Sequence, residues 1–304
     1  MVFVLKSFGT VRSHWMSRVI AAGLLISICT GLQASVPNQS IQKAPVDVVT
    51  VAGPTALDRG FSDLYNLDFD GAQREFSSWQ GLHPNDPVGP VSEAAGYLFS
   101  EFNRLGVLEA QFFTDNKFMA GKKLSPDPAL RSRFDQAIER GEKLAQARLA
   151  ANQKDSDGLF SLTLANGLRA DYAQLIEKRN LAALHYTRQA SDWAQQLLAV
   201  DPHRYDALLA TGFTKYVIGS MSAPMRWILR VGGLGGDKAA GIAELKTVST
   251  QGHYLAPFAR MLLAIAYVRE NDKTSAIDML SGLRRQFPAN ALFDREIRRL
   301  QTYP

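Results

Sequence analysis

Residues 232–236 are the part of this chain whose composition comes nearest to a known chemical function. They read Gly-Gly-Leu-Gly-Gly and are followed by Asp237 and Lys238. A P-loop ends in Gly-Lys-Ser or Gly-Lys-Thr, because its lysine and hydroxyl must reach phosphate and magnesium. This cluster ends instead in Asp237-Lys238-Ala239, and an aspartate at the start of a helix repels phosphate. We therefore predict a tight turn between two helices here and no nucleotide site.

The other residue types that could do chemistry lack the necessary spacing. The five histidines are His14, His83, His185, His203 and His253. No two of them are four positions apart or form the His-Glu-x-x-His pattern that places two imidazoles on one metal ion. No Gly-x-Ser-x-Gly sequence supplies a hydrolase nucleophile. Asp68 and Asp70 stand at a helix start, where Asp70 is expected to act as a cap. We predict no catalytic residue, no metal site and no cofactor, and therefore no enzyme.

Any site would have to be positioned by helices, and one spacing of residues occurs three times along the chain. It consists of alanine, a small or apolar residue four positions on, an apolar residue three further on, and then proline after five more. The copies are Ala72-Phe76-Trp79-Pro84, Ala190-Ala194-Leu197-Pro202 and Ala276-Leu280-Leu283-Pro288. This spacing is typical of a tetratricopeptide repeat (TPR), where a small residue lies at the crossing of two antiparallel helices and proline ends the second helix. Leu263, Ala264 and Tyr267 occupy the packing positions of the first helix of the third copy.

Helical periodicity covers most of the chain beyond residue 56, and no convincing strand pattern appears. We predict helices at about 57–67, 72–79, 91–104, 108–113, 128–152, 157–172, 180–200, 208–217, 225–231, 238–248, 254–269, 274–287 and 290–300. Asp155 or Asp157 is expected to cap the sixth of these, and Asp237 the tenth. The expected fold is all-α, a TPR-like solenoid of helical hairpins over residues 57–304.

The N-terminus has the pattern of an export signal. Lys6, Arg12 and Arg18 precede an uncharged apolar run from Val19 to Leu32. This run of 14 residues is shorter than the roughly 20 that cross a bilayer as a helix. We predict a signal peptide over residues 1–34, with cleavage near Ala34, and an uncleaved membrane anchor is the alternative. Residues 35–56 are predicted to be a disordered tether. The expected location is the periplasm or envelope of a bacterium.

Removal of the signal would change both the thiol content and the charge. Cys29 is the only cysteine, and Ile28 before it is too large for a lipoprotein signal. The mature chain would have no thiol, which excludes disulfides, thiolate metal sites and cysteine nucleophiles. The net charge would fall from +5 to +2, because the segment carries three basic and no acidic side chains. A charge of +2 without a basic stripe gives no indication of nucleic-acid binding.

Residues 208–293 contain a distinctive series of small and apolar residues, namely Gly212-Phe213, Ser220, Ala223-Pro224, Ile228-Leu229, the stretch from Gly232 to Lys238, and Gly241, Ile242 and Leu245. With these residues the segment resembles the eukaryotic inclusion-body clearance family of TPR proteins. Two departures are Gly233-Leu234-Gly235 in place of Gly-Phe-Ser, and Lys238 in place of arginine. The remainder resembles exported bacterial TPR proteins in general. The resemblance implies stacked helical hairpins and partner binding, without catalytic residues.

A polar run is the first candidate binding surface. It comprises Arg169, Asp171, Tyr172, Glu177, Lys178 and Arg179. It lies on an insertion of about 13 residues within the second repeat, judged against a 34-residue period. Such an insertion can form a binding lip on one face of the array, and its alternative is a solvated helix extension. Trp193 and Tyr216 are further aromatic candidates, and the sequence leaves open whether they and Tyr172 face solvent or the core.

The segment Met225–Arg230 is the second candidate. On a helix Arg226 and Arg230 share one face, while Trp227 lies off it. A short basic amphipathic helix with tryptophan can rest in a membrane interface. Burial of this helix between repeats is the alternative, and it is the interpretation that we favour here.

The sequence therefore favours a non-enzymatic exported scaffold that binds a protein or peptide partner on its concave face. The expected binding residues are Arg169, Asp171, Tyr172, Trp193, Tyr216, Arg226 and Trp227. The alternative is a peripheral membrane-associated envelope protein that docks through residues 221–234. A hydrolase of a novel type is a third class, with weak support.

Overall fold

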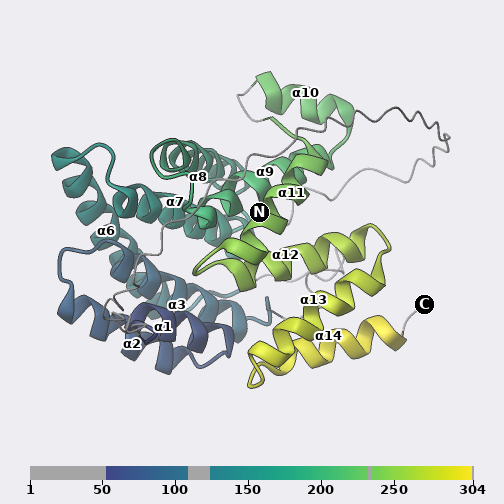
Figure 1. Cartoon of the computed structure of the whole chain (residues 1–304), viewed down its shortest axis with the longest axis horizontal. Coiled ribbons are helices and arrows are strands. Elements are labelled where there is room, and N and C mark those ends of the chain that lie inside the picture. Colours follow the sequence, from purple (N-terminus) through teal and green to yellow (C-terminus); the bar gives the residue numbers. More distant parts are fainter. Residues whose placement is uncertain (1–52, 109–123, 232–234, 303–304) are drawn as a thin grey trace, which may run out of the picture. The chain divides into compact units, whose positions relative to one another are not determined.

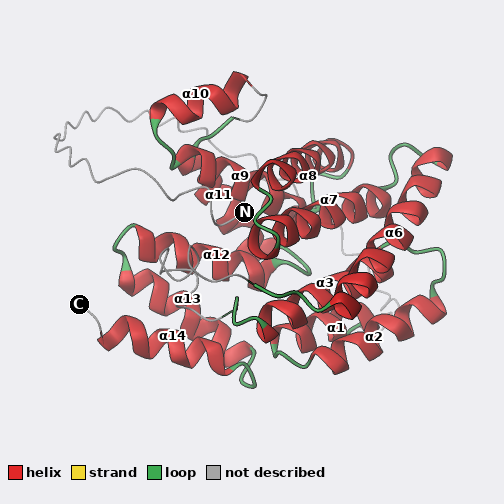
Figure 2. Ribbon diagram, turned by 180° about the vertical axis from the view of Figure 1, so that it is seen from behind, coloured by secondary structure: helices red, strands yellow, loops and turns green. Residues whose placement is uncertain are grey.

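The computed structural model describes residues 53–108, 124–231 and 235–302, and every regular element within these ranges is a helix (Figure 1 and Figure 2). The α-helices are α1 (Ala56–Tyr65), α2 (Phe69–Leu82), α3 (Val88–Arg104), α6 (Pro128–Ala151), α7 (Ser156–Asp171), α8 (Asn180–Val200), α9 (Leu208–Gly219), α10 (Ala223–Val231), α11 (Lys238–Gln251), α12 (Ala256–Arg269), α13 (Lys273–Gln286) and α14 (Ala291–Thr302). The all-α prediction is confirmed for this part of the chain. The predicted signal peptide, most of the predicted tether, the helix expected at 108–113 beyond Leu108, and residues 232–234 lie outside the described residues.

The repeated alanine-to-proline spacing ends three helices at equivalent places. Helices α2, α8 and α13 stop two residues before Pro84, Pro202 and Pro288 respectively. The residues just before these prolines are His83, Asp201 and Phe287, whose φ angles are −129°, −137° and −128°. Proline disfavours the helical conformation in the residue that precedes it, so each helix must end there.

The alanines of this spacing lie at helix contacts, as predicted. Ala72, Ala194 and Ala276 are 0% exposed, and Ala190 is 3% exposed. They belong to α2, α8 and α13, which pack against the preceding helices α1, α7 and α12. A small side chain at such a position allows the two backbones to approach closely.

Helix starts agree with the sequence in most cases. Asp155 accepts a hydrogen bond from Gly158 N at the start of α7, and Asp237 accepts one from Ala240 N at the start of α11. The predicted cap Asp70 is wrong, because Asp68 accepts the bond from Gly71 N and Asp70 lies inside the first turn. Side-chain caps satisfy amide groups that a helix leaves without an internal partner.

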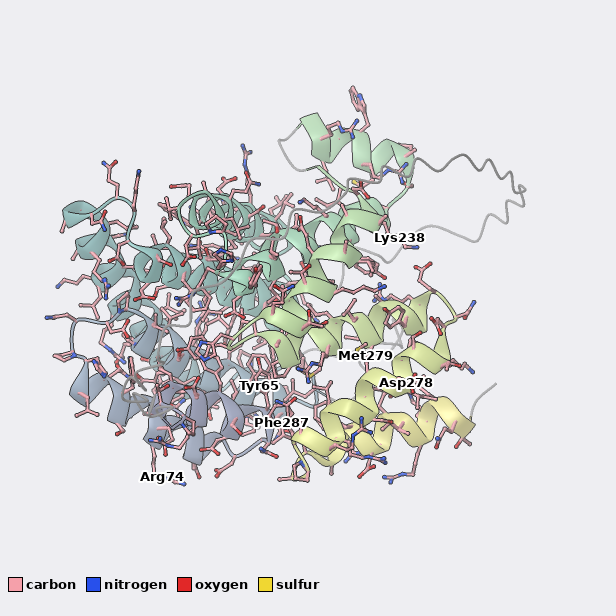
Figure 3. The ribbon with its side chains drawn as sticks, in the orientation of Figure 1. Tyr65, Arg74, Lys238, Asp278, Met279 and Phe287 are labelled. Atoms are coloured by element: carbon pink, nitrogen blue, oxygen red, sulfur yellow. The ribbon has the colours of Figure 1, made fainter. Side chains whose placement is uncertain are left out.

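Helices distant in sequence meet at Tyr65 of α1. Its hydroxyl donates to the carbonyl of Tyr254, which is 189 positions later, at 2.9 Å. Its own carbonyl accepts a bond from Asn290 Nδ2 at 2.9 Å, and its ring lies 5.3 Å from the ring of Phe287 (Figure 3). Phe61 of α1 stacks on Tyr254 at 4.8 Å. The first helical pair is thus fixed to the segments around α12, α13 and α14, and a space between the helices becomes bounded on several sides.

Candidate binding cavity

Two adjoining cavities of about 100 Å³ each lie among these helices. The first cavity is bounded mainly by α3, α7, α9 and α12, and the second mainly by α1, α3, α12 and α14. Four residues line both of them, namely Phe99, Leu108, Phe258 and Leu262. The two spaces therefore share a wall and present one continuous set of apolar side chains.

An aromatic pair forms the centre of this wall. Phe99 of α3 meets Phe258 of α12 edge to face, with ring centroids 5.8 Å apart and an interplanar angle of 82°. Phe99 makes a second edge contact with Phe102 at 5.8 Å. Both Phe99 and Phe258 are only half-buried. Their exposed area faces the cavities, so it is available to an apolar ligand.

The polar side chains around the first cavity are engaged in holding the helices. Thr163 donates to the carbonyl of Leu159 at 2.9 Å, and Thr214 donates to that of Ala210 at 2.7 Å. The Asp206 carboxylate accepts bonds from the backbone amides of Tyr254 and Leu255 at 3.2 and 3.0 Å. Asp171 and Thr187 also line the space and have interactions of their own.

The second cavity shows the same arrangement. Tyr65 and Asn290 form the hydrogen bonds described above, and the Glu296 carboxylate pairs with Arg299 one turn along α14. The side-chain oxygen Oδ1 of Asn290 accepts a further bond from Leu292 N at 3.0 Å. Among the described residues, both cavities therefore offer mainly carbon surface to an occupant.

Helix α7 leaves room on the side that faces the first cavity. Gly167 lies in its second half, and a Cβ atom placed there would meet no atom within 4 Å. Asp171, four positions later on the same face, also lines the cavity. Burial raises the pKa of the Asp171 carboxyl above its ordinary value, since low polarity favours the neutral form. Of the residues predicted from the polar run, Asp171 is the one that reaches this space.

The rest of the polar run divides between buried and exposed positions, with Tyr172 buried and Lys178 and Arg179 exposed. Tyr172 is buried, with 3% of its surface exposed, and its ring stacks on that of Phe134 at 5.1 Å. The Arg131 guanidinium of α6 lies 4.2 Å from the same ring and pairs with Glu177. The sequence left open whether Tyr172 faces solvent or the core, and the structure places it in the core beneath α6.

Local backbone geometry explains how the inserted residues fit. Residues Tyr172–Ile176 form a π-helical turn, which takes up extra chain within the line of α7. Lys178 has a φ of 61°, and its ammonium group donates to the carbonyl of Leu175 at 2.8 Å. Arg179 lies 3.5 Å from the Glu177 carboxylate. The chain thus reverses tightly into α8 instead of extending outward.

Three further predicted residues, Arg169, Tyr216 and Trp193, contact neighbouring helices. Arg169 donates to both carboxylate oxygens of Glu142 at 3.2 and 2.9 Å, which joins α7 to α6. Tyr216 is buried at 4% exposure within the cluster formed by α9, α11 and α12. Trp193 of α8 is half-buried and packs against the main core. Tyr216 therefore does not present a binding surface, since packing against neighbouring helices uses it.

Helix α10 differs from the expectation that we favoured. Trp227 is 68% exposed and Ile228 is 56% exposed, so this helix is not buried between repeats. Arg226 Nη1 donates to the carbonyls of Gly219 and Met221, both at 3.3 Å, and keeps α10 close to the end of α9. The burial prediction is wrong, because no neighbouring helix in the described part of the chain covers this side of α10.

Apart from Asp171, the sequence did not single out the cavity residues. Phe99, Leu209 and Phe258 each lie at a helical spacing from other apolar residues of the same helix. That pattern is also the pattern of ordinary core residues. A usable signal is that α9 and α12 are apolar around most of their circumference, which is typical of helices with contacts on both sides. A second signal is Gly167, whose small size in a helix interior has no capping or turn role.

Metal-binding clusters and membrane-spanning helices are both absent from the described residues. No group of three or more histidine, cysteine, aspartate or glutamate side chains could hold a metal ion there. No helix in the same ranges is long and apolar enough to cross a bilayer. The chain matches no protein-family model and no curated protein. Its function must therefore be argued from the cavities and the surface of the chain itself.

Proposed function

We propose that this chain is a non-enzymatic, exported helical-repeat protein of the TPR-like solenoid type, which binds the apolar side of a protein or peptide partner. The observation that carries the proposal is the pair of adjoining apolar cavities with the Phe99–Phe258 wall between them. Ligand sites of proteins are typically concave, mostly apolar and already formed before binding. The alanine-to-proline spacing and the signal pattern support the fold type and the export.

The hydrogen-bonding state of the lining residues indicates which form of partner fits. The threonines, carboxylates and amide that line the cavities already have interactions. An extended peptide would bring backbone groups that find no partner, and each buried group without one costs about 1–3 kcal/mol. A helix satisfies its backbone internally and can present only apolar side chains. The proposed partner therefore offers the apolar face of an amphipathic helix.

The same arrangement explains why no catalytic role is proposed. Catalysis needs polar groups that are free to bind or move protons at a reacting atom. Around these cavities the polar side chains position helices, as Asp206 does for the residues that precede α12. The site is suited to holding a ligand.

Site-specific photocrosslinking tests this function. A photoreactive phenylalanine analogue replaces Leu164, which is half-buried and lines the first cavity. The matched control carries the analogue at Leu82, which is 72% exposed at the end of α2. We expect one discrete crosslinked species from position 164 in cells that express the chain, and mass spectrometry should locate the link on an amphipathic segment. Equal labelling from both positions, or none from position 164, would contradict the proposal.

A further inference from the structure

Helix α10 concentrates exposed apolar side chains that are scattered elsewhere. Six large hydrophobic residues are exposed within the described part of the chain, and three of them are Met225, Trp227 and Ile228. The other three, Leu82, Leu181 and Val200, each lie at the end of a helix. Single exposed apolar residues are normal, whereas a contiguous group marks an interaction surface. Figure 1 shows α10 beyond the neighbouring α9 and α11.

The helix has one anchored side and one free side. Leu229 is half-buried and packs against the cluster that contains Phe213 and Tyr216, and Met221 just before the helix is buried in the same cluster. At about 100° per residue, Trp227 lies about 160° around the helix from Leu229, nearly opposite to it, and Ile228 lies about 100° from Leu229. The exposure of α10 is therefore compatible with a fixed attachment to the body of the protein.

Charge distinguishes the kind of partner that this surface fits. Arg226 and Arg230 lie four positions apart on one side of α10, next to the exposed apolar side chains. No acidic residue occurs from Met221 to Val231, and neither arginine forms an ion pair with a described carboxylate. Two positive charges beside an exposed tryptophan are complementary to a surface that is anionic at its boundary and apolar below it.

We propose that α10 docks this protein on an anionic bilayer. Trp227 and Ile228 enter the boundary between headgroups and acyl chains, while Arg226 and Arg230 contact lipid phosphates. Tryptophan is enriched at this depth, because its ring is apolar and its indole N–H is polar. This inference does not depend on the cavities, since α10 contributes no residue to their lining.

Co-sedimentation with vesicles tests the docking. The chain, as isolated, is mixed with vesicles of phosphatidylcholine alone or of equal parts of phosphatidylcholine and phosphatidylglycerol. We expect binding to the anionic vesicles that falls as salt is added, because the attraction of a surface charge is screened within a Debye length. Arg230→Glu, which leaves the hydrogen bonds of Arg226 to the end of α9 intact, should lose roughly thirty-fold in partition, and Trp227→Ala roughly ten-fold.

Matched controls separate docking from general stickiness. Leu181→Ala removes an exposed apolar residue on α8, and Arg285→Glu reverses an exposed charge on α13. Neither should change vesicle binding. Equal losses in the controls and the α10 variants, or binding that ignores phosphatidylglycerol, would overturn the proposal.

A depth measurement locates the contact within the chain. Quenching by lipids brominated along the acyl chain should reduce the fluorescence of the chain, and Trp227→Phe should abolish most of that reduction. If the chain binds vesicles but the quenching is the same in Trp227→Phe, another segment is responsible and the proposal fails. It also fails if no anionic vesicle binds, in which case a protein with an acidic apolar groove would be the better candidate for α10.

Discussion

The molecule holds available apolar surface in two regions, the adjoining cavities and α10, and the two differ in how that surface is bounded. The cavities lie between packed helices, and Tyr65 beside the second cavity connects α1 to the segments around α12 and α14. Helix α10 is attached through Leu229 and Arg226 and leaves Trp227 uncovered. In the cavities the polar groups are engaged, whereas neither arginine of α10 forms an ion pair with a described carboxylate. The cavities can therefore select a partner by its shape, and α10 can select one by its charge.

The largest expected difference between the two regions is in the free energy of unfolding, when one aromatic side chain is truncated in each of them. Phe160 lines the first cavity and is 0% exposed, so Phe160→Ala should lower the free energy of unfolding by about 3–5 kcal/mol. Trp227→Ala should change it by about 0.5 kcal/mol or less, because Trp227 is already in solvent. Urea unfolding followed by circular dichroism measures both. Similar losses for the two variants would show that α10 is packed into the body.

A smaller effect of opposite sign is expected when the cavity is filled. Gly167→Leu should raise the free energy of unfolding by about 1 kcal/mol from helix propensity, and further from burial of the new side chain. Gly282→Leu on α13 is the matched control, since a Cβ there also meets no atom within 4 Å but no cavity lies beside it. Thermal unfolding should show the larger gain for Gly167→Leu. If the two gains are equal or Gly167→Leu destabilises, the space beside α7 is not open.

The start of α1 can be weakened at Asp58, which forms a capping box with Thr55 and pairs with His253. Burial opposes ionisation of this carboxyl, but hydrogen bonds from Thr55 and the neighbouring His253 outweigh it and lower its pKa. A lowered pKa stabilises the folded state above the ordinary value of 3.8, and this contribution is lost as the pH falls below it. Asp58→Asn should therefore cost about 1 kcal/mol at neutral pH and less in acid. A cost that is independent of pH would mean that the charge of Asp58 plays no part.

The smallest effect is expected from reversal of the charge of Arg230 on α10. Arg230→Glu should alter the free energy of unfolding by about 0.5 kcal/mol or less, since Arg230 is exposed and has no described carboxylate partner. Denaturant unfolding of the isolated variant checks this. A loss of several kcal/mol would show that Arg230 belongs to the folded core.

The sequence predicted those features that depend on local geometry. Helix ends before Pro84, Pro202 and Pro288 follow from a steric clash with the preceding residue, and the burial of Ala72 and Ala276 follows from their spacing. Most caps and helix ranges are also local properties. The prediction that Asp70 caps α2 was wrong, because Asp68, two positions earlier, accepts the hydrogen bond from the amide of Gly71.

Features that depend on distant contacts could not be predicted in the same way. Tyr172 and Trp227 are both aromatic residues beside charged neighbours, yet one is buried under α6 and the other is exposed. Helix α6 packs over Tyr172, whereas no described helix covers Trp227. Helical periodicity does not predict which helices pack together. The cavities likewise depend on the contact between Tyr65 and Tyr254, and no local pattern in either segment indicates it.

Crosslinking from position 164 in the two glycine variants tests the central claim most directly, namely that the first cavity holds the partner. The claim predicts that Gly167→Leu removes the crosslinked species, because the new side chain fills the site, and that Gly282→Leu leaves its yield unchanged. Both variants should be folded, as unfolding measurements would verify. An undiminished crosslink in a folded Gly167→Leu protein would contradict the claim.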